Sequence, residues 1–279
     1  MIQAFTTENW KKIISFIPKE DSFNFDENTF AVADGVTRDP LEYLPDIKTL
    51  KGKLAFAWNY KRPSPAKVAA DLFCITSTHV LKDFDIKDKT AITEAFEISN
   101  NKIKEYNNLT FDDIDYLTND FAGCVASLAV KNKEYVHFGF ISDCGVAIFD
   151  EKGNLKFRTE DEGPLKYKKE RWSSEQMKRL SWENPEARII TRRDFRNNPE
   201  NPYSFGVLTG EDTAMHYVKI RTQEIRPSEH LIVYTDGLED VIFSNEFVDR
   251  IRQKDNKGLK KLCQKRVKTE GTLIHPLVF

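Results

Sequence analysis

Three strand-like segments follow one another between residues 124 and 159, and only short polar turns separate them. They read CVASLAVKN, EYVHFGFISD and GVAIFDEKGNLKFRT. Parallel neighbours need a crossover of a dozen or more residues, whereas antiparallel strands can be joined by a short turn. The block therefore predicts three or four consecutive antiparallel strands.

Two long helices are predicted upstream of this block. Ser64 is suited to cap a helix that begins at Pro65, and apolar residues then recur near helical spacing as far as Val80. Residues 91–106 repeat this spacing. Further elements are predicted as strands at 23–34 (with a turn at 26–28), 229–236 and 272–279, and as helices at 245–253 and 257–267. Grouped rather than alternating elements predict an α+β fold, with antiparallel sheets covered by helices.

The composition narrows the classes of partner. The chain has 279 residues and a formal net charge of −2, so no global field attracts nucleic acid or an anionic membrane, and such a partner would need a local patch. No uncharged apolar run is long enough to span a bilayer, and the N-terminus lacks the apolar segment of a signal peptide. We expect a monomeric cytoplasmic protein with no nucleic-acid or membrane partner.

No linker or repeat divides the sequence, so we expect one domain over residues 1–279. The segment 160–202 is crowded with charge and is predicted to be a surface excursion or flap of variable structure. The four cysteines have no spacing typical of a metal site and are predicted to be buried free thiols, namely Cys74, Cys124, Cys144 and Cys263.

Three predicted strands end on an aspartate. These are Asp34 in VADGV, Asp143 in ISDCG and Asp236 in YTDGLED. Asp-Gly is a strong turn signal, so each aspartate alone is more simply a turn residue. After Asp34 and Asp236, however, no strand clearly returns two residues later, as a hairpin requires. A carboxylate at the end of a buried strand carries a desolvation cost unless a cation or a donor compensates it.

A divalent metal would remove both the desolvation cost and the mutual repulsion of these carboxylates. Oxygen ligands suit Mg²⁺ or Mn²⁺, whereas zinc would call for His or Cys, and neither clusters here. Two such ions can lower the pKa of a shared water and hold it in line with phosphorus. The pattern therefore indicates hydrolysis of a phosphoester.

Five motifs, in this order, resemble those of the metal-dependent protein phosphatases, the PPM or type 2C serine/threonine class. They are Lys19-Glu20-Asp21-Ser22, FAVADG at 30–35, GCVAS at 123–127, FISDCGVAIF at 140–149 and LIVYTDGLED at 231–240. The resemblance spans nearly the whole chain. It implies a β-sandwich of two antiparallel sheets, flanked on both outer faces by helix pairs, with the metal ions at one end.

The resemblance also implies roles for individual residues. Asp34 would bridge two Mg²⁺ or Mn²⁺ ions and Gly35 would offer its carbonyl. Glu20 would bind the second ion through water, and Asp236 would bind the first. Asp21 resembles a structural or water-ordering acid beside the site. Asp34 and Asp236 would thus be the catalytic residues, holding a hydroxide that attacks the phosphorus of phosphoserine or phosphothreonine in a protein.

A weaker third ion is implied at Asp143 and Asp240. The last metal-binding aspartate of the family falls at Thr269 in this chain, with Glu270 one place later. Glu270 is either a longer ligand that reaches the metal or an exposed turn residue. These alternatives stay open on the sequence.

Two other positions depart from the family pattern. Val36 stands where eukaryotic members have a histidine that acts as general acid, so either water protonates the leaving alcohol or turnover is slower. Phe16 stands where those members have a phosphate-binding arginine, and the nearest cations are Arg38 and Lys19. Two alternatives follow: a catalytically impaired regulatory or scaffold protein with a phosphatase fold, or a phosphatase of small metabolites.

Overall fold

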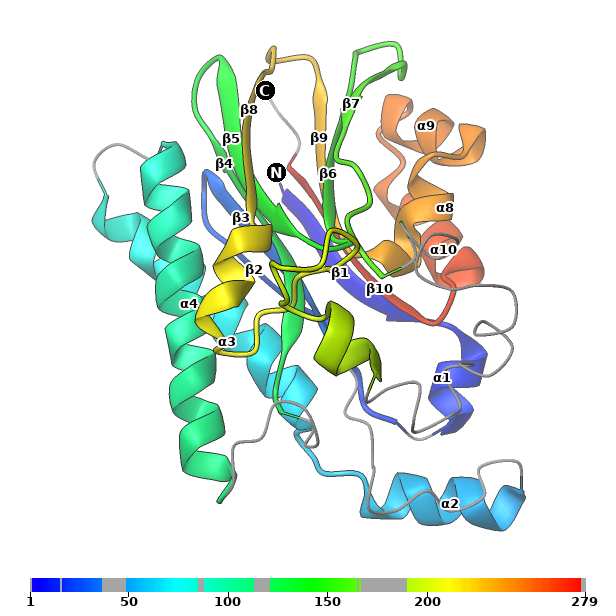
Figure 1. Ribbon diagram of the computed structural model, residues 1–279. Helices are drawn as coiled ribbons and strands as arrows, with labels where there is room; N and C mark the ends of the chain where they lie inside the picture. The colour runs from blue at the N-terminus through cyan, green and yellow to red at the C-terminus, as the bar shows by residue number, and fades with distance from the viewer. Residues whose placement is uncertain are drawn as a thin grey trace.

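The computed structural model describes residues 2–15, 17–36, 49–84, 88–112, 121–164, 166 and 190–276. Two five-stranded antiparallel sheets face each other at its centre (Figure 1). One sheet has the order β2 (Ser22–Phe25), β3 (Thr29–Gly35), β4 (Cys124–Lys131), β5 (Tyr135–Ile141) and β8 (Lys219–Glu224). The other has the order β1 (Ile2–Glu8), β10 (Glu270–Pro276), β9 (His230–Tyr234), β6 (Gly145–Phe149) and β7 (Leu155–Arg158).

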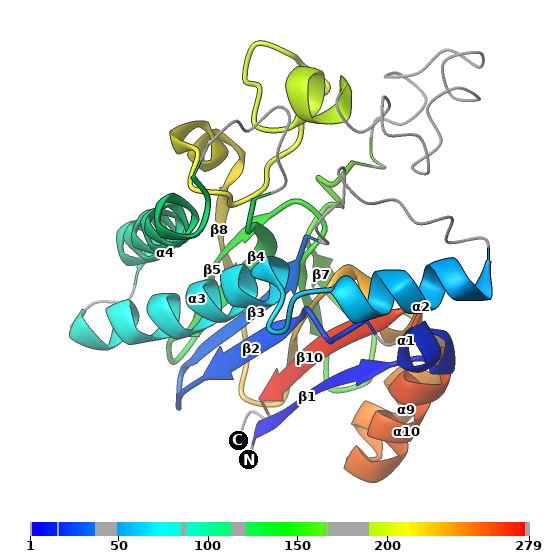
Figure 2. The same cartoon turned by 90° about the horizontal axis from the view of Figure 1, so that it is seen from below.

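Helices cover both outer faces of this sandwich (Figures 1 and 2). The β2–β8 sheet carries α3 (Pro65–Val80) and α4 (Lys89–Thr110). The β1–β7 sheet carries α8 (Glu239–Ile242), α9 (Asn245–Arg252) and α10 (Asn256–Arg266). Short helical turns lie at Leu81–Asp83, Thr191–Phe195, Asp212–Tyr217 and Asp236–Leu238. The predicted fold class, an α+β sandwich flanked by helices, is confirmed.

Local sequence signals set these elements. Asp26 accepts hydrogen bonds from the amides of Asn28 and Thr29 and so forms the predicted β2–β3 turn. Ser64 caps α3 by accepting from the amide of Lys67, with Pro65 in the first turn. The four cysteines are buried and free, as predicted.

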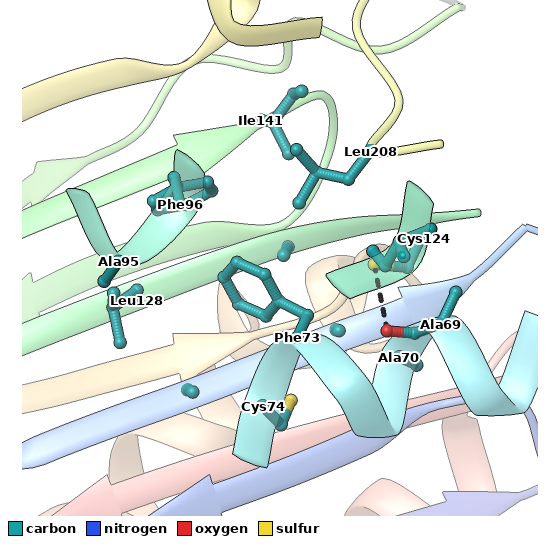
Figure 3. Close-up of a cluster of buried hydrophobic side chains, with 14 of the residues drawn as sticks. Ala69, Ala70, Phe73, Cys74, Ala95, Phe96, Cys124, Leu128, Ile141 and Leu208 are labelled. Carbon is teal, nitrogen blue, oxygen red and sulfur yellow. Dashed lines mark hydrogen bonds between the residues drawn. The ribbon is translucent and has the colours of Figure 1, made fainter. Parts of the chain in front are cut away.

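Three buried clusters fill the layers. The first lies between α3, α4 and the β2–β8 sheet, where Phe73 and Phe96 pack with ring centroids 5.0 Å apart (Figure 3). The second lies between the two sheets and includes Phe30 and Val233. The third lies under α8–α10. The sandwich is therefore held rigidly from both sides, and its strand ends are fixed supports for side chains.

Among the described strands and α-helices, those not predicted are β1, β8, α1 (Trp10–Ser15), α2 (Leu50–Asn59) and the short α8. The last strand also begins at Glu270, two residues before its predicted start, and is described only as far as Pro276. Most of the segment 160–202 lies outside the described residues. Among the described residues, none of the helices has the length and apolar character that a bilayer-spanning segment requires.

Candidate metal and phosphate site

Four aspartates gather at one end of the sandwich, each from a different strand end. Asp21 directly precedes β2, and Asp34 is the last residue but one of β3. Asp143 lies in the connection from β5 to β6, which crosses between the sheets, and Asp236 follows β9. Asp21 is buried and the other three are half-buried. The three aspartates that the sequence singled out are therefore brought together, and Asp21 joins them.

These carboxyl groups act directly on one another. The carboxyl group of Asp34 lies within hydrogen-bonding reach of those of Asp21 and Asp236. Burial, followed by repulsion from Asp21, Asp236 and Asp143, raises the pKa of Asp34 well above its ordinary value. Two carboxylates in direct contact cannot both be charged without a large cost, so at neutral pH this group needs protons or a cation.

Asp21 is the most enclosed member. Burial, and then the charge of Glu270, raises the pKa of Asp21 to about 7. Hydrogen bonds from Thr235 and Thr272 act in the opposite direction, and the Thr235 hydroxyl donates to Asp21 Oδ2 over 2.7 Å. Asp21 is thus held by hydrogen bonds from Thr235, which follows β9, and from Thr272 in β10, while its carboxyl group faces Asp34.

Asp143 is presented by a constrained turn. The preceding residue, Ser142, has a φ of 66°, a left-handed conformation that residues other than glycine rarely adopt. Burial, and then the charges of Asp236 and Asp161, raises the pKa of Asp143 to about 7. A Cβ added at Gly163 would lie 2.8 Å from Asp143 Oδ2, so the chain passes closely over this carboxylate.

Gly35 packs tightly against its surroundings. A side chain there would come within 2.7 Å of the Ala66 carbonyl oxygen and 2.8 Å of the Glu20 carbonyl oxygen. The glycine after Asp34 is therefore required by the close approach of three backbone segments. The packing explains the glycine without a metal, so the role of the Gly35 carbonyl as a metal ligand stays a prediction.

Glu20 is buried and already held by the protein. Its Oε1 accepts hydrogen bonds from the Tyr60 hydroxyl over 2.5 Å and from the Ser64 hydroxyl over 2.7 Å. Lys12 Nζ lies 3.8 Å from Glu20 Oε2. The carboxylate predicted to bind a metal through water thus has hydroxyl donors and an ammonium group beside it.

Glu270 is also buried, which excludes the alternative of an exposed turn residue and leaves its role as a metal ligand a prediction. Its carboxylate accepts from the amide of Glu20 over 2.9 Å and from the amide of Asp21 over 3.0 Å. Lys12 Nζ lies 3.3 Å from Glu270 Oε2. Glu270 is not an exposed turn residue; it fixes the backbone that carries Glu20 and Asp21, and its oxygens are occupied by these donors.

Three further residues were predicted for the site, namely Lys19, Asp240 and Arg38. Lys19 is exposed and pairs with Glu8, with 3.6 Å between Nζ and Oε1. Asp240 is exposed and pairs with Lys268, with 3.5 Å between Nζ and Oδ2. The prediction for Arg38 lies outside the described residues. The Lys19 and Asp240 side chains thus have partners of their own, and the roles predicted for them at the site stay predictions.

The cluster fits a hard divalent ion by ligand chemistry. Its donors are buried or half-buried carboxylate oxygens, several of which repel one another, and carboxylate oxygens are the ligands that Mg²⁺ or Mn²⁺ prefers. Within the described part of the chain, however, no group of three or more His, Cys, Asp or Glu side chains is arranged to hold a metal ion as it stands. Binding would require the carboxylates to turn toward a common centre.

Sequence reasoning missed several residues. Asp161 acts electrostatically on Asp143 and Asp236, and Thr235 donates to Asp21. Thr235 could have been found, because it directly precedes Asp236 in the YTDG motif. Lys12 has no local signal, since its partners Glu20 and Glu270 belong to other elements.

A polar cavity of about 340 Å³ opens next to Asp143. Ser142 and Glu162 line one end of it, and the Glu162 amide donates to the Ser142 carbonyl over 3.1 Å. Its other walls include Asn201, Tyr217 and Lys219. A group held at the aspartates would therefore have room for neighbouring atoms on this side.

No protein-family profile matches the sequence, and no curated protein matches it. Solved structures do match. The serine/threonine phosphatase PstP/Ppp of Mycobacterium tuberculosis is similar with a TM-score of 0.64 and 14% identity, over 99% of this chain and 97% of that one. The Streptococcus (S. agalactiae) serine/threonine phosphatase gives 0.64 and 13%, over 99% and 98%.

Two further structures are informative. The serine/threonine phosphatase Stp1 of Staphylococcus aureus is similar with a TM-score of 0.62 and 11% identity, over 98% of this chain and 93% of that one. The catalytic domain of PstP in complex with two manganese ions gives 0.61 and 15%, over 99% and 96%. Because the likeness runs over the full length of both partners in each pair, this chain has the fold of the serine/threonine phosphatases.

Proposed function

We propose that the chain is a Mg²⁺- or Mn²⁺-dependent phosphatase that acts on phosphoserine or phosphothreonine in proteins. The observation that carries this proposal is the convergence of Asp21, Asp34, Asp143 and Asp236 from four strand ends, with all four pKa values raised, first of all by burial. Such a group suits a cation, and it lies in a fold that serine/threonine phosphatases share.

Asp34, Asp236 and Asp143 would hold the ions, with Asp21 beside them and Glu20 at the edge. When bound, the ions supply a water of lowered pKa as nucleophile and neutralise the charge of the phosphate. Thr235 and Thr272 keep Asp21 oriented through hydrogen bonds. Val36 has no ionisable group that could act as a general acid, so the leaving alcohol would take its proton from water.

The polar cavity beside Asp143 would receive the residues that flank the phosphorylated side chain. Lys219 contributes a cation to its wall and Asn201 an amide. The presence of this cavity favours phosphopeptides over small phosphorylated metabolites as substrates.

We also propose that residues 1–279 form a single domain, that it works as a monomer and that it is cytoplasmic.

One observation favours a second function, a binding module without turnover. Glu20 is held by Tyr60, Ser64 and Lys12, and Glu270 by two amides and Lys12. With Thr269 in the place of a family ligand, the first ion would have fewer carboxylates. A regulatory or scaffold protein with weak metal binding would result.

Hydrolysis of a phosphopeptide, a sugar phosphate and an aryl phosphate tests the proposal, with chelator-treated protein and added Mn²⁺ or Mg²⁺. We expect metal-dependent release of phosphate, highest kcat/KM for the phosphopeptide, and a loss of about 100-fold or more in Asp34→Asn and Asp236→Asn. Asp212→Asn is the matched control, because Asp212 is exposed and pairs with Lys104 on α4.

Full activity in Asp34→Asn would contradict the proposal. Absence of turnover together with absence of Mn²⁺ binding by calorimetry would favour the binding module. Higher kcat/KM for the sugar phosphate than for the phosphopeptide would favour the metabolite phosphatase.

A further inference from the structure

The helices α1 and α2 expose large apolar side chains to solvent. On α1 these are Trp10, Ile13 and Ile14, with exposed fractions of 65%, 53% and 58%. On α2 they are Leu50, Leu54 and Trp58, with exposed fractions of 74%, 51% and 90%. We refer to these six side chains together as the α1–α2 surface.

The exposed apolar side chains follow one stripe on each helix. Trp10, Ile13 and Ile14 have the spacing of one helical face, and residues 50, 54 and 58 follow one stripe of α2. The two helices contact each other, and Figure 2 shows them side by side at the edge of the sandwich. Figure 1 shows α2 projecting below the rest of the molecule.

No comparable patch occurs elsewhere in the described residues. The other exposed large apolar side chains are spread singly over different elements, for example Ile75 on α3 and Leu109 on α4. Single exposed apolar residues are normal on a protein surface, whereas a gathered set marks a contact surface.

Lysines lie on these two helices and just after α2. Lys11 and Lys51 lie on the two helices and Lys61 follows α2, and all three are exposed. Neither helix contains Asp or Glu. Of the described residues, no carboxylate lies within ion-pair distance of these three lysines. The charged residues of the two helices themselves are therefore all basic, although the whole chain has a net charge of −2.

A lipid surface fits these features better than a protein does. Trp and aliphatic side chains combined with lysine are typical of helices that lie in the interface of an anionic bilayer. Tryptophan prefers the headgroup level, since its ring is apolar and its N–H is polar. A projecting ridge can enter a fluid surface directly, whereas a protein partner would need a matching groove.

We propose that the α1–α2 surface docks on the anionic surface of a phospholipid bilayer. Trp58, Leu54 and Trp10 enter the interface, and Lys11, Lys51 and Lys61 contact the headgroups. Because Tyr60 follows α2 and donates to Glu20, the bilayer lies next to the aspartate cluster. This proposal differs from the expectation of no membrane partner, which rested on the net charge of the whole chain.

Co-sedimentation of the purified chain with phosphatidylcholine vesicles, with and without about one-third phosphatidylserine, tests the proposal. We expect binding to the anionic vesicles that weakens as salt is raised. The double variant Leu54→Ala, Trp58→Ala should bind about 10-fold more weakly or worse, because apolar burial is lost. The matched control is the double variant Ile75→Ala, Leu109→Ala, which removes exposed apolar residues elsewhere and should bind as the wild type does.

Charge-reversal variants measure the electrostatic contribution to vesicle binding. Lys51→Glu with Lys61→Glu should weaken binding to the anionic vesicles, whereas Lys133→Glu, an exposed lysine between β4 and β5, should not. Circular dichroism and thermal unfolding check that each variant is folded. Brominated lipid should quench the fluorescence of the wild type more than that of Trp58→Phe.

Three outcomes would overturn the proposal. The first is no binding to anionic vesicles at low salt, and the second is wild-type binding by the Leu54→Ala, Trp58→Ala variant. The third is a dimer in sedimentation velocity that this variant abolishes while vesicles have no effect, because the surface would then pair with a second copy. None of these readouts depends on phosphatase activity, so they stand apart from the test of the proposed function.

Discussion

Two groups of acidic side chains meet at the same end of the sandwich, and the protein treats them differently. Glu20 and Glu270 are surrounded by donors: two hydroxyls, two backbone amides and the ammonium group of Lys12. The nearby aspartates, by contrast, are placed mainly against one another, as Asp34 is against Asp21 and Asp236. The two groups are joined through Asp21, whose amide binds Glu270 and whose carboxyl group faces Asp34.

The two groups differ in how fully hydrogen-bond donors compensate their charge. A buried carboxylate with enough donors is stable as it stands and supports the fold. A buried carboxylate that mainly faces other carboxylates destabilises the fold until something outside the chain compensates it. By this criterion the two glutamates support the fold, and the aspartates are the candidates for binding a cation.

The largest effect is expected from removal of a glutamate. Glu270→Ala leaves Lys12 and the amides of Glu20 and Asp21 without their acceptor, so the free energy of unfolding should fall by about 3–5 kcal/mol. Urea unfolding of the metal-free protein measures this. Glu246→Ala, at an exposed position on α9, is the control and should change stability by less than about 0.5 kcal/mol. A loss below about 1 kcal/mol in Glu270→Ala would show that Glu270 does not have this stabilising role.

Replacement of an aspartate should raise the free energy of unfolding rather than lower it, and the size of this gain should depend on pH. The pKa of Asp143 is about 7 in the folded protein and 3.8 as the ordinary value. Between these values the unfolded chain releases a proton that the folded chain keeps, so stability conferred at low pH is lost as the pH rises through 7. Metal-free Asp143→Asn, which cannot titrate there, should gain stability relative to the wild type from pH 4 to pH 7, by about 2–4 kcal/mol.

Unfolding curves in chelator at a series of pH values measure this gap between the two proteins. Asp212→Asn, at an exposed position, should track the wild type throughout. A gap that stays constant with pH would mean that Asp143 is already compensated in the folded state, as the glutamates are.

The smallest effect is expected from a single donor. Tyr60→Phe removes the hydroxyl that donates to Glu20 over 2.5 Å, while Ser64 and Lys12 stay in place. Stability should fall by about 1 kcal/mol, the usual contribution of one hydrogen bond. Tyr203→Phe, at an exposed tyrosine, is the control in the same unfolding assay. If Tyr60→Phe lost no stability, Glu20 would resemble the aspartates in being open to an outside ligand.

The sequence predicted the elements whose signals are local. The α3 cap at Ser64, the β2–β3 turn at Asp26 and the strand ends at Asp34 and Asp236 all depend on neighbours within a few residues. The edge strand β8 was not predicted, because KIRTQE carries several charges and lacks a continuous apolar run.

The role of Glu270 was equally beyond local reasoning. Its partners Glu20 and Asp21 are some 250 residues earlier, and only the folded chain brings them to it. Lys12 was missed for the same reason, since nothing around WKK shows which carboxylates it will meet. What the sequence lacks is the three-dimensional distribution of donors, which decides which acids are compensated and which are not.

The pairing of β1 with β10 has a consequence for how the protein is made. In its sheet β1 is an edge strand whose partner is β10, with Ile2 opposite Pro276 and Glu8 opposite Glu270. During synthesis the first strand must therefore wait until more than 260 residues have emerged, with its edge unprotected in the meantime. Asp21 and Asp34 can be placed early by the β2–β3 hairpin, but the amides that anchor Asp21 find Glu270 only at that late step. The hydrogen bonds to Glu270 that support the aspartate cluster therefore form last. They join distant parts of the chain, and such contacts form slowly.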